Sequence, residues 1–113
     1  MQKIIIFLLF LLPLAFGFTT SQEVSSVNCE PIYNLQETGR TSNSISYSWG
    51  GVIDALEYSV WYTRQEDNYT SPRFTTGSTS FTFTNLASGN YTFYFVTDCG
   101  GTQSIIVNDT DAM

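Results

Sequence analysis

Few residues in this 113-residue chain are of a type that does chemistry: there are two cysteines, ten carboxylates and no histidine. The carboxylates Asp54 and Glu57 lie close together in the sequence, as do Glu66 and Asp67. Two carboxyl groups held about 5–10 Å apart across a cleft can hydrolyse a glycosidic bond. These acids lie in turn-like sequence, however, and so small a domain has little room for a cleft. We therefore interpret them as solvated loop charges.

Other kinds of catalysis are not indicated either. Serines and threonines are abundant because they suit exposed strand faces, and none lies in the Gly-x-Ser-x-Gly sequence of a hydrolase nucleophile. The acids also lack the alternating aspartate spacing of a calcium loop. We expect a protein that is not an enzyme, with no catalytic residue, no metal and no cofactor.

Cys29 and Cys99 are the remaining reactive residues, and their role depends on the cellular compartment. In an exported chain two cysteines indicate one disulfide. It would close a loop of about 70 residues and stabilise the fold by roughly 4 kcal/mol, because it restricts the unfolded chain. The alternative is a pair of free thiols in metal or redox chemistry, which lacks both a histidine and a Cys-x-x-Cys pair.

Residues 1–17 have the features of a secretory signal peptide. Lys3 is the only charged residue before the apolar run Ile4–Leu12, and small residues follow up to the expected cleavage point after Gly17. The alternative, a membrane anchor, needs about 20 apolar residues to cross a bilayer, and this apolar stretch is shorter. We expect a secreted protein with no membrane insertion after cleavage, in which residues 18–27 form a flexible polar lead-in.

The charge of the cleaved chain excludes some partners. Loss of Lys3 leaves three arginines against ten acidic residues, a net charge of −7. No cluster of basic residues is available to neutralise phosphates, so nucleic acid and anionic membranes are poor partners. The acidity is better explained by solubility.

Short segments in which apolar and polar residues alternate follow the lead-in, which is the pattern of half-buried β-strands. No window shows an apolar period of 3.6 residues, and β-branched and aromatic residues dominate these segments. We expect an all-β fold, a seven-stranded antiparallel β-sandwich. The clearest strand segments are 45–49, 57–64, 73–76, 81–84, 91–97 and 104–107.

Three residues near the sixth of the expected strands have the spacing of a tyrosine corner. Leu86 is followed by Gly89 and then by Tyr91, which begins a strand. In such a corner the tyrosine hydroxyl bonds back to the backbone of the preceding loop and secures the edge of the sandwich. We predict structural roles for these three residues, and for Trp49 as the tryptophan of the core.

The ordered set of strand patterns resembles a fibronectin type III domain over Cys29 to Val107, which places the domain at residues 28–108 and a tail at 109–113. An antibody-type domain would have a cysteine two residues after the corner tyrosine, where this chain has Phe93. Cys29 and the pair Cys99-Gly100 are similar to those of secreted bacterial type III modules. The short last strand departs from the pattern. The residues that carry the resemblance are Pro31, Leu35, Ile45–Trp49, Tyr58–Tyr62, Ser80–Leu86, Gly89 and Tyr91–Phe95.

The resemblance makes the third and sixth strands neighbours in one sheet. If Tyr58, Val60 and Tyr62 point inward, alternation sends Trp61 outward, and the same reasoning applies to Tyr94. We therefore predict an exposed binding patch of Trp61 and Tyr94, with Phe74 or Tyr69 near its edge. The alternative is that these aromatics cover the sheet, packed against another domain or against long side chains.

The resemblance implies a non-catalytic exported interaction or spacer module that binds an extracellular protein or a polysaccharide. The alternative from another class is a fragment or accessory spacer domain of a secreted polysaccharide-degrading enzyme. Three Asn-x-Thr sequons begin at Asn68, Asn90 and Asn108, and we expect them to be unused.

Overall fold

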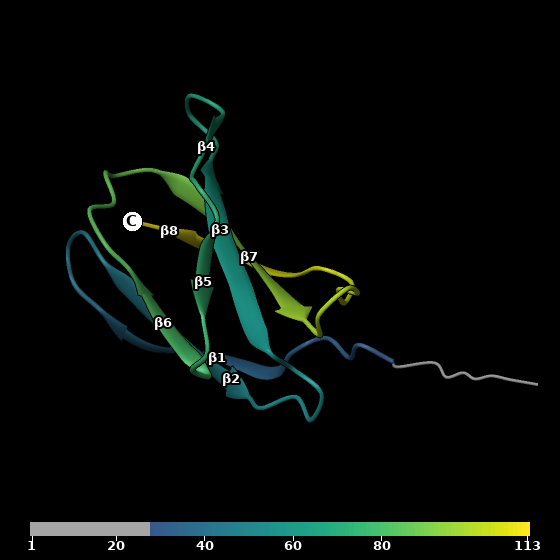
Figure 1. The fold of residues 1–113 in the computed structure, drawn as a ribbon. Coiled ribbons are helices and arrows are strands. Elements are labelled where there is room, and N and C mark those ends of the chain that lie inside the picture. The colour runs from purple at the N-terminus through teal and green to yellow at the C-terminus, as the bar shows by residue number, and fades with distance from the viewer. Residues whose placement is uncertain (1–27) are drawn as a thin grey trace, which may run out of the picture.

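A computed structural model describes residues 28–113 of the chain. The predicted signal peptide (1–17) and the predicted lead-in (18–27) lie outside the described residues. Two antiparallel sheets face each other, as Figure 1 shows, and the buried side chains between them form one core. The predicted all-β sandwich is confirmed.

Eight strands make up the two sheets, one more than predicted. The smaller sheet has the order β1-β2-β6, and the larger has the order β4-β3-β7-β8, with β5 also paired to β3. The extra strand arises because the segment after β3 returns to it twice, as the short pieces β4 and β5. The bounds are β1 Tyr33–Arg40, β2 Ile45–Gly50, β3 Glu57–Arg64, β4 Tyr69–Thr70, β5 Phe74–Thr76, β6 Ser80–Phe83, β7 Asn90–Asp98 and β8 Val107–Ala112.

The core is mainly aromatic and is supplied by alternate residues of facing strands. Trp49, at the end of β2, packs with ring centroids 5.4 Å from Tyr58 and 5.5 Å from Phe95. Fully burying a large apolar side chain contributes about 1.5–3 kcal/mol, so this cluster is the main source of stability. Its fully buried large side chains are Ile45, Tyr47, Val60, Phe83, Phe93 and Phe95.

The corner before β7 is held by a hydrogen bond. The Tyr91 hydroxyl donates to the carbonyl oxygen of Ala87 at 2.8 Å, and Leu86 is buried beneath the loop. Gly89 has a φ of 151°, which side-chain-bearing residues rarely adopt. A Cβ there would lie 2.7 Å from a carboxylate oxygen of Glu66, so both conformation and space favour glycine.

The last strand differs from the prediction. The sequence predicts this strand at 104–107 with a tail at 109–113, whereas β8 pairs with β7 from Val107 to Ala112. The apolar signal is missing because two of the inward residues of β8 are carboxylates with tertiary partners. Asp109 accepts a hydrogen bond from the buried Tyr47 hydroxyl at 2.9 Å, and Asp111 pairs with Arg40 at 2.6 Å.

The predicted disulfide between Cys29 and Cys99 is present, with the two Cα atoms 5.8 Å apart. It ties the segment before β1 to the start of the β7–β8 loop. In Figure 1 this segment and this loop leave the sandwich on the same side. The disulfide therefore joins two parts of one end of the molecule.

Candidate binding surfaces

The two residues at the centre of the predicted patch lie together. Trp61 of β3 is directly opposite Tyr94 of β7, and their rings stack with centroids 5.2 Å apart and planes 10° apart. Both lie on the outer face of the larger sheet, since Val60 and Phe95 beside them are buried in the core. Strand alternation therefore predicts their side correctly, and the strand order implied by the family resemblance predicts that they are partners.

The expected exposure of Trp61 is wrong. Only 9% of this residue is exposed, because the Arg73 guanidinium lies 3.8 Å from the centre of its ring. Arg73 precedes β5, and its side chain covers the indole in a cation–π contact. Only Tyr94 of the pair remains partly exposed. Trp61 thus covers the sheet beneath a long side chain, which was the alternative to a binding platform.

Phe74 and Tyr69 do not extend this stack. Phe74 lies opposite Val60, which places it on the inner side of the sheet, and its ring stacks on Phe81 at 5.6 Å. Tyr69 lies 6.1 Å from the ring of Tyr62, near the edge of the core. Both residues help to close the gap between the sheets at that edge, so the four predicted patch residues do not form one surface.

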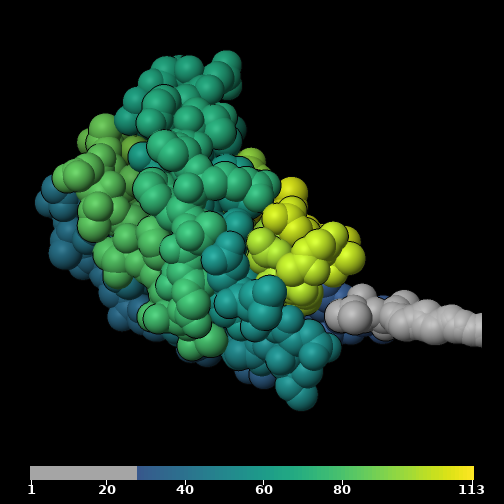
Figure 2. All heavy atoms as spheres, viewed as in Figure 1, coloured from purple at the N-terminus to yellow at the C-terminus, as the bar shows by residue number. Residues whose placement is uncertain are grey.

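Apolar side chains are exposed instead at the end of the sandwich that carries the disulfide. The β2–β3 loop (51–56) and the β7–β8 loop (99–106) meet there, because Glu57 at the start of β3 pairs with Asp98 at the end of β7. Figure 2 shows atoms of the two loops side by side. We call their four exposed aliphatic residues the apolar pole: Ile53 (96% exposed), Leu56 (71%), Ile105 (75%) and Ile106 (50%).

The two loops of the apolar pole are held in place. The Leu56 amide donates to the Asp98 carbonyl at 2.8 Å, and the Cys99 amide donates to the Thr102 carbonyl at 2.9 Å. Leu56 also lies against Gly100, where an added Cβ would come within 2.7 Å of its side chain. Sequence periodicity does not identify these residues because they lie in loops. The sequence signal that could have identified them is the presence of aliphatic residues within otherwise turn-like segments.

The charges around the apolar pole are all negative. Glu57 and Asp98 are directly opposite each other, and neither forms an ion pair within residues 28–113. Like charges in this arrangement destabilise a sheet. The arginines lie elsewhere: Arg40 pairs with Glu37 and Asp111, Arg64 pairs with Asp67, and Arg73 covers Trp61.

The carboxylates of the β3–β4 turn have structural partners. Glu66 accepts hydrogen bonds from the Asn90 backbone amide at 3.0 Å, and these hold the pKa of its carboxyl below the usual value. The Arg64 guanidinium likewise lowers the pKa of Asp67. A general acid at neutral pH needs the opposite shift. Within residues 28–113 no group of three or more His, Cys, Asp or Glu residues could hold a metal ion.

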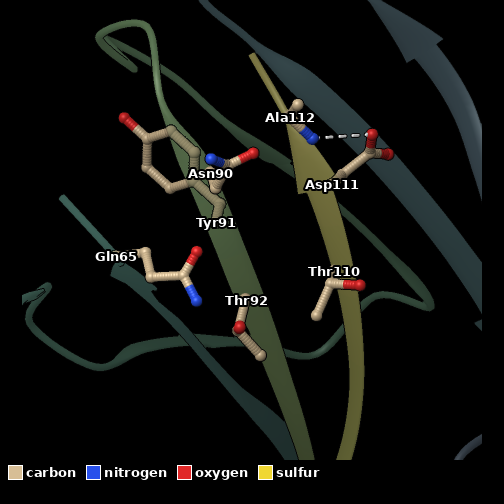
Figure 3. A pocket seen from close by; sticks show the side chains of 7 residues that line it. All are labelled: Gln65, Asn90, Tyr91, Thr92, Thr110, Asp111 and Ala112. Atoms are coloured by element: carbon tan, nitrogen blue, oxygen red, sulfur yellow. Dashed lines mark hydrogen bonds between the residues drawn. The ribbon is translucent and has the colours of Figure 1, made fainter.

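The far end of the outer face has a polar hollow of about 530 Å³ at β7 and β8, shown in Figure 3. The Thr92 and Thr110 side chains come from neighbouring strands, and the amides of Gln65 and Asn90 lie near them. No charged side chain dominates this hollow, since Asp111 at its edge is paired with Arg40. The part of the chain that the structure describes also has no helix long and apolar enough to cross a membrane.

No protein-family profile matches the chain, and no curated protein matches it. Solved structures match its fold. The fn3 domain of the human collagen alpha-1(XX) chain has a TM-score of 0.68 at 15% identity, covering 81% of this chain and 91% of that one. Domains d3–d4 of the rat CD45 extracellular region have a TM-score of 0.66 at 12% identity, covering 84% and 70%. The twitchin kinase region from C. elegans has a TM-score of 0.60 at 19% identity, covering 76% of this chain and 16% of that one.

Proposed function

From the premise that this chain has the fibronectin type III fold, we propose that it is a non-catalytic exported interaction module that docks another extracellular protein through the apolar pole. Domains with this fold are generally interaction or spacer modules, so the fold gives the class of function but not the partner. A disulfide in such a fold is typical of extracellular domains.

The exposure of Ile53 and its neighbours is the observation that carries the proposal. The four residues lie on two neighbouring loops that touch through Leu56 and Gly100, and exposed apolar surface at one end of a domain can mark an interaction site. Burying aliphatic side chains of this kind contributes about 25 cal/mol for each Å² removed from water. The disulfide and the loop hydrogen bonds hold these residues before binding, which reduces the entropy lost on docking.

The charge of the pole indicates the kind of protein surface that fits it. Its acids face no cation within residues 28–113, so a partner with arginine or lysine around an apolar centre would relieve the repulsion between Glu57 and Asp98. A second copy of this acidic chain would add to that repulsion instead. The proposed partner is therefore a different protein with a basic rim.

Site-specific photo-crosslinking tests this function in a culture of the organism that secretes the protein, where its extracellular partners are present. A benzophenone amino acid at position 53 should form one dominant adduct with another extracellular protein, and the additional change Leu56→Ser should reduce its yield at least fivefold. The same crosslinker at Tyr69, which is exposed away from the pole, is the matched control and should give no such adduct. Equal labelling from both positions, or none from position 53, contradicts docking at the pole.

The second candidate is a spacer domain of a secreted polysaccharide-degrading enzyme. The observation that favours it is that this fold also occurs inside longer chains, since the match covers only 16% of the twitchin kinase region. Sequencing the gene beyond the codon of Met113 discriminates the interaction module from the spacer domain. A frame that continues into a hydrolase domain supports the spacer, and the crosslinking result then decides whether the pole contacts that domain.

A further inference from the structure

Four threonines form a row across the outer face of the larger sheet. They are paired in register on adjacent strands, as Thr70–Thr63, Thr63–Thr92 and Thr92–Thr110. Neighbouring strands are about 4.8 Å apart, so three spacings give a row of about 14 Å. The row therefore runs across β4, β3, β7 and β8, at the opposite end of the sheet from the apolar pole.

Two neighbouring hollows follow this row. The one in Figure 3 contains Thr92 and Thr110, and a second, of about 350 Å³, contains Thr63 and Thr70. Both are lined by Gln65 and Thr92, so they are neighbours along the row, and we call the two together the threonine groove. Each hollow falls within the range of about 300–1,000 Å³ of small-molecule sites.

The threonine groove has unused hydrogen-bonding groups. Among residues 28–113, no protein hydrogen bond engages the side chains of Gln65, Thr92 or Thr110. Each hydroxyl can donate one hydrogen bond and accept others, and the amide can do both. The groove also has an aromatic border, because the Tyr94 hydroxyl lies 3.3 Å from that of Thr63. Tyr94 is partly exposed there and stacks on Trp61.

Two charges beside the threonine groove are paired, and a third, the Glu66 carboxylate, accepts hydrogen bonds from the backbone and side-chain amides of Asn90. Arg64, at the hollow that contains Thr63 and Thr70, pairs with Asp67 at 2.5 Å. Asp111, at the hollow of Figure 3, pairs with Arg40 at 2.6 Å. A ligand in the groove therefore meets mainly hydroxyls, amides and one aromatic ring, with the Glu66 carboxylate at the Asn90 end. This set matches a molecule whose surface alternates hydroxyl groups with small apolar faces.

We propose that the threonine groove binds a neutral oligosaccharide, with its chain laid across the strands. The threonine hydroxyls and the Gln65 amide exchange hydrogen bonds with the sugar hydroxyls, and an apolar sugar face packs on the exposed part of Tyr94. This binding site is separate from the apolar pole and does not depend on the docking of a protein there.

Two other ligand classes fit the groove less well. An anionic glycan would meet a chain with a net charge of −7 after Lys3 is removed, and the cation beside the groove is already paired. A protein partner needs a buried apolar anchor at the centre of its interface. Short polar side chains line this groove, and the exposed aliphatic residues lie at the other end of the sheet.

Binding should be measured by calorimetry with hexasaccharides of glucan, mannan and xylan, and with oligogalacturonate as the anionic probe. For this experiment the protein should be produced by export from a host that does not glycosylate asparagine, because Asn68 and Asn90 of two sequons line the groove. At least one neutral probe should bind, and its dissociation constant should rise at least tenfold in Thr92→Val/Thr110→Val. That double variant keeps the shape and strand preference of both residues.

The matched control is Thr75→Val, an exposed threonine of β5 opposite Ser59, outside the groove on the same sheet. It should change the affinity less than twofold. Tyr94→Ala should weaken the same probe, and Ile53→Ser should not affect it. The proposal is overturned if no neutral probe binds at millimolar concentration, if oligogalacturonate binds more tightly, or if the valine variant binds as well as the wild type.

Discussion

The guanidinium of Arg73 covers what would otherwise be the largest exposed aromatic ring on the outer sheet face. We expect Arg73→Ala to lower the free energy of unfolding by about 0.5–2 kcal/mol, the range of cation–π contacts. It should also expose Trp61, so that tryptophan emission shifts to the red and becomes accessible to a quencher. The shifted component should be absent from the Arg73→Ala/Trp61→Phe double variant, since Trp49 stays in the core. Unchanged quenching would show that Arg73 does not cover the ring in solution.

A second prediction concerns the Tyr91 hydroxyl. Its hydrogen bond to the Ala87 carbonyl satisfies a part-buried backbone acceptor, and Tyr91→Phe removes only the donor. The free energy of unfolding, measured by urea denaturation, should fall by about 1–3 kcal/mol. Tyr69→Phe is the matched control, because Tyr69 is exposed, and it should change stability by less than about 0.5 kcal/mol. Equal effects of the two changes would exclude a special role for the corner.

At the scale of the elements, β8 is held to the core through polar contacts. Asp109 accepts the hydrogen bond of Tyr47, whose ring is fully buried, and burial together with this bond raises the pKa of the Tyr47 hydroxyl. Asp109→Ala leaves that hydroxyl without an acceptor and should cost about 1–3 kcal/mol in urea denaturation. Adding Tyr47→Phe removes the buried donor too, so the double variant should recover part of the loss. A double variant less stable than Asp109→Ala would contradict this account of β8.

The β3–β4 turn should make stability depend on pH. The pKa of Glu66 is lowered in the folded protein, chiefly by the Asn90 backbone amide, so its contribution is present above the unfolded pKa of about 4.3 and is lost as the pH falls through the folded value. We expect Glu66→Gln to have a lower Tm than the wild type at pH 6, and the two melting curves to converge at acidic pH. A constant difference at all pH values would show that charge is not the cause.

At the scale of the whole molecule, the disulfide joins the segment before β1 to the β7–β8 loop. Cys29→Ser/Cys99→Ser should lower the free energy of unfolding by about 2–5 kcal/mol, because the unfolded chain regains its freedom. The same variant should lower the yield of the crosslink from position 53, because the apolar pole loses its restraint. Affinity for a sugar at the threonine groove should be unchanged in folded protein, because that groove lies at the other end of the sheet. If the variant lost both the crosslink from position 53 and the affinity for the sugar, the disulfide would support the entire fold rather than one end.

The features that depend on local pattern can be predicted from the amino-acid sequence. Alternation in β2, β3 and β7 assigns side chains to one face or the other, because successive residues of a strand point in opposite directions. The pairing of Trp61 with Tyr94 needed, in addition, the strand order that family resemblance supplied. Two cysteines in a chain allow only one disulfide.

The accessibility of these side chains and the contacts between distant residues depend on the three-dimensional fold. Arg73 covers Trp61 from the segment before β5, and the partners of Asp109 and Asp111 come from the other sheet. The row of threonines likewise depends on the registers of four strands. Alternation along one strand carries no information on contacts with other segments of the chain. The covered indole and the threonine groove therefore depend on how the strands of the larger sheet pair, and the polar last strand depends on how the two sheets pack.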